Sequence, residues 1–404
     1  MTIRAISCAL GLIVGWSAVN GSAAVSADPA TLRFLEQRVK SDPLDSIALN
    51  RLSVACIVQM RETGDLAFLD RALQSARSSL AAVPASQNSG GLAALAVAEL
   101  ELHHFREALA LARQAYTIDP RNLGALATAG DAELELGDYA EAGKTYAMLS
   151  EGDPAPPVRA RLARLAELKG DPQNAIALLR QNLGTGVDSV WYRVRLGELH
   201  FRMGDLEKAD DLYESARRLR PESYLVLEHL AELRAAQGKY DDALALYQKV
   251  VAMVPRAEFF QALGDLYVFM KRPAEARPWH DRALTTYLKS VEAGNAHYYH
   301  HLAGFYSDVR ENPAEALRWA RQDKAIRNSI YACDTLAWAL YRNGEFAAAA
   351  EEMAKALALG TKDAHLLFHA GMIYSRAGQI ERGGEFLKQA LAANPRYNSF
   401  HMHR

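Results

Sequence analysis

The sequence is poor in cysteine and in uncompensated charge, and each shortage excludes a class of protein. Three cysteines among 404 residues are too few for the disulfide framework that stabilises small secreted domains. Lys and Arg number 46 against 48 Asp and Glu, which gives a formal net charge of −2. Because a nucleic-acid backbone is held by clustered basic residues, this balance argues against a nucleic acid as the partner.

Recognisable catalytic motifs are also missing. The sequence has no Gly-x-Ser-x-Gly elbow, no phosphate-binding Gly-Lys-Ser loop and no His-Glu-x-x-His pair. Its carboxylates alternate with Lys and Arg, as between Asp205 and Arg218, in the manner of a solvated helix face. We therefore predict that the protein is not an enzyme and that it carries no cofactor.

Long apolar runs are confined to the N-terminus. Arg4 precedes the apolar run Ala9–Trp16, and the small residues Ala23–Ala27 follow it. This order is typical of a secretory signal peptide, and the run is short for a membrane span. We predict a signal peptide at 1–27 and a periplasmic mature chain without a membrane span. The alternatives are an extracellular protein or one anchored by an uncleaved leader.

What the sequence does contain is a small residue that recurs every 33 or 34 residues, with one longer step. It follows an apolar residue at Ala96, Gly130, Ala163, Gly197, Ala231, Gly264, Ala303, Ala337 and Gly371. A second series runs in parallel at Ala108, Ala142, Ala175, Ala209, Ala243, Ala276, Ala316, Ala349 and Gly383, and an earlier unit has Ala55 and Ala72. The pattern resembles the tetratricopeptide repeat, a helix–turn–helix unit of 34 residues.

The resemblance implies an all-α, right-handed superhelical solenoid of about ten such units. Small residues let the two helices of a unit touch, and stacked units share one continuous core. The longer step contains an overlong second helix, Trp279–Ala293, which Gly294 ends. These features divide the mature chain into a capping helix at 28–45, about seven units at 46–294, about three units at 295–397 and a tail at 398–404.

In this family the first helix of each unit lines a concave groove, so the resemblance also predicts a binding face. In the N-terminal units this face is small and plain, whereas from Trp191 onward it becomes acidic and aromatic. The predicted groove residues are Trp191, Glu198, Phe201, Glu228, Glu232, Asp265, His297, His300, Tyr331, Asp334, Trp338, Tyr341 and Phe368. Aromatic side chains of this kind anchor peptides or stack on sugars. The alternative is that they pack against second helices.

The histidines raise the question of a metal site. His297, His300 and His301 lie at helical spacing before Asp308, and His401 and His403 form a His-x-His pair. Such residues bind Zn²⁺ or Cu²⁺ when they complete a coordination shell. No complete set of ligands is evident in the sequence, so we predict no metal.

Three functions fit this pattern. The first is a non-enzymatic scaffold of the bacterial cell envelope that binds a protein or peptide partner in the C-terminal groove. The second is a polysaccharide- or peptidoglycan-associated module of an export or assembly complex. The third is self-assembly through the last unit, near Tyr397 and Phe400. An acidic groove favours basic or polar partners over acidic peptides.

Overall fold

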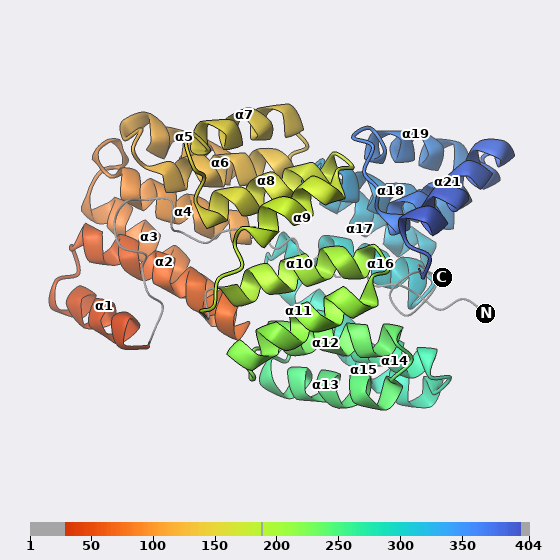
Figure 1. Cartoon of the computed structure of the whole chain (residues 1–404). Coiled ribbons are helices and arrows are strands. Elements are labelled where there is room, and N and C mark those ends of the chain that lie inside the picture. Colours follow the sequence, from red (N-terminus) through yellow and green to blue (C-terminus); the bar gives the residue numbers. More distant parts are fainter. Residues whose placement is uncertain (1–28, 187–188, 397–404) are drawn as a thin grey trace. The chain divides into compact units, whose positions relative to one another are not determined.

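The computed structural model describes residues 29–186 and 189–396, which fold into α-helices joined by short turns (Figure 1). No β-strand occurs within these two ranges. The predicted signal peptide at 1–27, the tail at 398–404 and the residues Tyr397, Phe400, His401 and His403 lie outside them. None of the described helices is long and apolar enough to cross a membrane.

Helix α1 (Pro29–Ser41) precedes ten helix pairs in the described chain. The first helices of the pairs are α2 (Ser46–Thr63), α4 (Ser89–Glu101), α6 (Leu123–Glu135), α8 (Pro156–Leu168), α10 (Val190–Arg202), α12 (Tyr224–Ala236), α14 (Ala257–Phe269), α16 (Tyr299–Asp308), α18 (Ile330–Arg342) and α20 (Ala364–Arg376). The second helices are α3 (Ala67–Ala82), α5 (Phe105–Ile118), α7 (Tyr139–Leu149), α9 (Pro172–Arg180), α11 (Leu206–Leu219), α13 (Tyr240–Met253), α15 (Pro273–Glu292), α17 (Pro313–Ile326), α19 (Phe346–Ala356) and α21 (Ile380–Ala393). Two short 3₁₀ turns, η1 (Ala85–Gln87) and η3 (Ala296–Tyr298), precede α4 and α16. The predicted all-α repeat fold is confirmed.

Two helices, α1 and α15, depart from the regular pattern of pairs. Leu32 and Leu35 of α1 are buried in a cluster with residues of α2 and α3, so α1 covers apolar surface of the first pair. Helix α15 is 20 residues long and ends before Gly294, whose φ of 92° is open to glycine at little steric cost. This is the overlong helix that the sequence predicts.

The described chain forms two compact units, which divide within α8. We call them the N-terminal unit (residues 29–162) and the C-terminal unit (residues 163–396). A change of arm near residue 294 would be a further subdivision inside the C-terminal unit, and it stays a prediction. The site developed below lies entirely in the C-terminal unit.

The recurring small residues are where two helices of a pair touch. A Cβ atom on Gly197 would collide with the ring of Tyr213, 16 residues later, and a Cβ on Gly130 would meet Tyr146 in the same way. At Gly264 the colliding ring belongs to His280. Close-packed interiors do not absorb an added methyl group without a shift. The regular spacing of small residues in the sequence therefore follows from the close contact between the two helices of each pair.

The first and last repeats of the C-terminal unit contact each other. The Thr361 hydroxyl, in the turn before α20, donates a hydrogen bond to the carbonyl oxygen of Leu168 at the end of α8. Asn394, just after α21, donates from its amide to the carbonyl oxygen of Arg202 at 2.8 Å. The last repeat is consequently covered by an earlier part of the same unit.

Candidate binding groove

A pocket lies among the first helices of the last four repeats. The space within it is about 720 Å³ when the part that is open solvent is included. Its walls come from α14, α16, α18, α20 and the residue Arg327 after α17. The lining residues are Gln261, His300, His301, Gly304, Ser307, Asp308, Arg327, Tyr331, Asp334, Thr335, Trp338, His365 and His369. Successive first helices therefore build one shared cavity.

The pocket brings together four of the residues predicted for the groove. His300, Tyr331, Asp334 and Trp338 all line it, although they come from two different repeats. The remaining nine predicted residues lie on α10, α12, α14, η3 and the outer parts of α18 and α20. They are Trp191, Glu198, Phe201, Glu228, Glu232, Asp265, His297, Tyr341 and Phe368. Their part in binding stays a prediction.

Several of these predicted carboxylates are engaged inside the fold. Asp265 is buried and contacts His280 Nε2 at 2.8 Å, and Glu228 contacts the His229 ring at 2.7 Å. Burial alone would lower the pKa of His229, but the carboxylates of Glu228 and its neighbours outweigh it and raise the pKa to about 10. A buried charge is tolerated where it is paired in this way.

Glu198 belongs to a buried ion-pair network at the start of the C-terminal unit. Its carboxylate pairs with Arg195 and, at 2.6 Å, with Arg202. Arg202 also reaches Glu167 at 3.2 Å and lies 3.7 Å from Asp363, the N-cap of α20. Burial opposes ionisation of Glu198, yet the surrounding guanidinium groups hold its pKa well below the usual range. The network links the first repeat of the unit to the last.

Trp338 is fixed on one wall of the pocket. It stacks on His369, with ring centroids 4.0 Å apart and planes 9° from parallel, and on Tyr341 at 4.7 Å and 15°. Its indole Nε1 donates to the Asp308 carboxylate at 3.2 Å. Residues three apart on a helix share a face, which places Tyr341 beside Trp338. Trp338 is therefore a rigid wall of the pocket.

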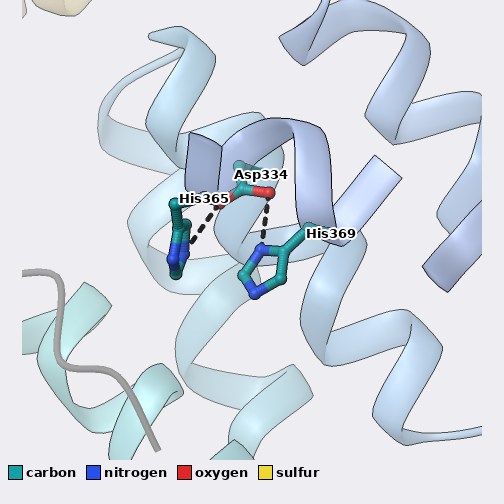
Figure 2. A group of neighbouring side chains, drawn as sticks. All are labelled: Asp334, His365 and His369. Carbon is teal, nitrogen blue, oxygen red and sulfur yellow. Dashed lines mark hydrogen bonds and ion pairs between the residues drawn. The ribbon is translucent and has the colours of Figure 1, made fainter. Parts of the chain in front are cut away.

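Asp334, His365 and His369 form a compact polar cluster on the same wall (Figure 2). The Asp334 carboxylate lies 2.9 Å from His369 Nδ1 and 3.7 Å from His365 Nε2. Burial raises the pKa of Asp334 to about 7 and lowers the pKa of His369 to about 3. Burial, together with the neighbouring His369, lowers the pKa of His365 to about 4. Both imidazoles are neutral at pH 7.

Tyr331 lines the pocket, and its hydroxyl oxygen is buried. The guanidinium of Arg164 lies over its ring, 5.3 Å from the centroid, and burial raises the pKa of its phenol. Within the described chain, the Tyr331 hydroxyl has no hydrogen-bond partner. A buried hydroxyl without a partner is costly, so this oxygen is an energetic weak point of the pocket wall.

Sequence reasoning missed His369 and passed over Arg327. The four-residue spacing of His365 and His369 on one helix face is a usable signal, but the metal-site prediction considers His297, His300 and His301 instead. Nothing local pointed to Arg327, which follows α17 and pairs with Asp323 at 2.9 Å. Its place in the pocket results from the packing of two repeats.

A stack of helix pairs whose first helices share a cavity defines an α-solenoid, a class of interaction scaffolds. A family model described as Tetratricopeptide repeat matches residues 194–258, 232–298 and 335–398, and a second model of that description matches residues 99–165. Together these matches cover more than half of the chain. The chain belongs to the tetratricopeptide repeat family, whose fold is typically a non-catalytic scaffold for protein partners.

The similarities to individual proteins are short or distant. Over 125 residues the chain is 30% identical to the human protein O-mannosyl-transferase TMTC1. The matched segment makes up 31% of this chain and 13% of that protein. The human IFIT1 dimer with PPP-AAAA has a TM-score of 0.47 and 15% identity, covering 91% of this chain and 95% of that one. A tetratricopeptide repeat protein from Parabacteroides merdae matches with a TM-score of 0.36 and 21% identity. The match covers 59% of this chain and 93% of that one.

Proposed function

We propose that the protein is a non-enzymatic scaffold of the bacterial cell envelope, and that it binds a protein or peptide partner in the groove of its C-terminal repeats. The observation that carries this proposal is the pocket shared by α14, α16, α18 and α20. A peptide that crosses these helices gains contacts from four successive repeats. The signal-peptide pattern at the N-terminus supports export to the envelope.

The side chains of the pocket favour a partner with hydrogen-bond donors or positive charge. Asp308 and Asp334 contribute carboxyl groups; Asp308 also lies 3.8 Å from Arg342, and burial raises the pKa of Asp334 to about 7. Arg327, the one lysine or arginine that lines the pocket, pairs with Asp323. Trp338 and Tyr331 supply aromatic surface of the kind that anchors a partner side chain. An acidic peptide would find Arg327, already paired with Asp323, as the one lysine or arginine among the lining residues.

A paired substitution tests this assignment without removing a core residue. Thr335 is half-buried at the pocket, so Thr335→Arg places a bulky cation there. Thr285→Arg makes the same change on the exposed side of α15 and serves as the matched control. The mature chain and both variants are cross-linked to the envelope fraction of the native organism, after circular dichroism has shown equal helicity.

The expected result is a small set of proteins captured by the parent and by Thr285→Arg and lost from Thr335→Arg. An identical set from all three would overturn the groove assignment. Binding of isolated cell-wall polysaccharide by the parent, with no protein captured, would favour the glycan-associated alternative. Location is tested separately: cell fractionation should find a chain cleaved after Ala27 in the periplasm, and an unprocessed cytosolic chain would contradict export.

A further inference from the structure

The cluster of Asp334, His365 and His369 presents donor atoms for a metal ion. His365 and His369 lie four residues apart on α20, so their rings project from one face of that helix. Asp334 reaches them from α18 (Figure 2). One atom from each residue lies within 4.8 Å of the other two.

These separations are close to those of a coordinated ion. Donor atoms around a tetrahedral Zn²⁺, with bonds of about 2.1 Å, lie about 3.4 Å apart. The observed 2.9 Å between Asp334 and His369 and 3.7 Å between Asp334 and His365 lie on either side of that value. The two distances run to different carboxylate oxygens, Oδ1 for His369 and Oδ2 for His365, so the side chains would have to rearrange to direct one donor atom each at a single ion.

The surroundings hold the donor groups in place and leave one side accessible. Trp338 stacks on the His369 ring at 4.0 Å, and the Asp363 carboxylate caps α20 by accepting from the amides of His365 and Leu366. All three donor residues also line the pocket. An ion held by them would have its remaining coordination position open to that pocket, as in zinc sites that keep a water or a ligand.

Other groups of histidine and carboxylate in the described chain are less suited to an ion. The groups Glu99–His104–Glu107 and Glu228–His229–Glu232 each contain a single histidine. In the second group the imidazole of His229 stays protonated at neutral pH, so neither ring nitrogen has a lone pair to donate. Within the described chain, only Asp334, His365 and His369 place donor atoms of two imidazoles and a carboxylate within 4.8 Å of one another.

We propose that Asp334, His365 and His369 bind a divalent transition-metal ion, with Zn²⁺ the best match to two imidazoles and one carboxylate. The site goes beyond the scaffold function and does not depend on it, because the ion and the partner are detected by different measurements. A bound ion would link α18 to α20 and present an open coordination position at the pocket.

The test is a titration of the mature chain with Zn²⁺ in competition with a chromophoric chelator. His401 and His403 form a separate His-x-His pair, so the parent for this experiment carries His401→Ala and His403→Ala. It should bind one equivalent of Zn²⁺, and the ion should raise the melting temperature because it binds the folded state. Co²⁺ should give the visible absorption of a low-symmetry site with nitrogen and oxygen donors.

Variants then assign the ligands. His365→Ala, at a half-buried position, and Asp334→Asn should each weaken Zn²⁺ binding by at least about tenfold. The control is His280→Gln, which alters another buried histidine–aspartate pair and should leave the affinity unchanged. If His365→Ala fails to fold, His365→Gln replaces it. No stoichiometric binding by the parent, or equal affinity in His365→Ala and His280→Gln, would overturn the proposal.

Discussion

The side-chain amide of Asn394 donates a 2.8 Å hydrogen bond to the backbone carbonyl oxygen of Arg202, 192 residues earlier in the chain. Asn394 is fully buried, and its own carboxamide oxygen accepts from the amide of Arg396. A Cβ atom on Gly204 would collide with Asn394, so the two segments are in close contact. The end of the last repeat is thus part of the packed interior of the C-terminal unit.

Replacing Asn394 with Ala should weaken the contact between the end of the last repeat and the end of α10. The change leaves the Arg202 carbonyl and the Arg396 amide without their partner, at a cost of about 1–3 kcal/mol. Hydrogen exchange should accelerate in α21 and at the C-terminal end of α10, because local opening becomes easier. Asn343→Ala removes an exposed amide that bonds to Glu345 and should have little effect. Equal protection in both variants would show that the contact does not stabilise the unit.

Replacing Gly197 with Ala should destabilise the pair α10–α11. The added methyl group meets the ring of Tyr213, and overpacking of this kind costs about 1–3 kcal/mol. The matched control is Gly384→Ala in α21, where nothing lies within 4 Å of the new Cβ and better helix propensity should stabilise by up to about 1 kcal/mol. The urea midpoints should move in opposite directions, and a shift of the same sign would contradict the packing argument.

These two substitutions show what the sequence could and could not predict. The Gly197–Tyr213 contact lies within one repeat, so its spacing recurs and can be recognised from the sequence. The Asn394–Arg202 contact depends on small rotations accumulated over 192 residues, which no local pattern specifies. Periodicity likewise places Glu198 on a first helix, but it does not reveal that the Glu198 carboxylate is paired with Arg195 and Arg202.

The candidate site was also predictable only in part: the residues of a single helix could be recognised, but not their partners in other repeats. Tyr331, Asp334 and Trp338 were found because one face of α18 is rich in aromatic and acidic residues. The sequence analysis does not single out His369, whose 2.9 Å contact with Asp334 joins α20 to the preceding repeat. Contacts between repeats combine residues about 35 apart, so their chemistry emerges only when the repeats are stacked.

His301 should make the protein less stable in acid. It stacks on Tyr287 with centroids 5.5 Å apart, and burial lowers its pKa to about 4. The unfolded chain therefore binds a proton that the folded chain does not, and the stability contributed by neutral His301 is lost as pH falls from about 6.5 to 4. The loss should approach about 3 kcal/mol.

His301→Phe keeps an aromatic ring beside Tyr287 but cannot titrate. Urea midpoints of parent and variant are compared at pH 7 and pH 4.5, where other groups titrate alike in both proteins and cancel in the difference. The parent should lose more stability than the variant on acidification. Parallel losses would mean that His301 is protonated in the folded chain.

His229 should show the opposite behaviour. Burial opposes its charge, but the carboxylates around it raise its pKa to about 10. Because the pKa of His229 is higher in the folded chain than in the unfolded chain, protonated His229 stabilises the fold fully below about pH 6.5. This stabilisation is lost as the pH rises through 10. In a titration followed by NMR of the histidine rings, His229 should remain protonated at pH 8. A midpoint near pH 6.5 would contradict the assigned pairing with Glu228.

The most direct test of the scaffold account is photo-crosslinking in living cells from a single position. A photoreactive amino acid replaces Thr335 in the pocket of the full-length chain, and the same residue placed at Thr285 on the exposed side of α15 is the control. The account predicts a discrete crosslinked protein from position 335 that is absent from position 285. The same products from both positions, or none from position 335 in a folded and exported chain, would contradict a partner-binding groove in the C-terminal repeats.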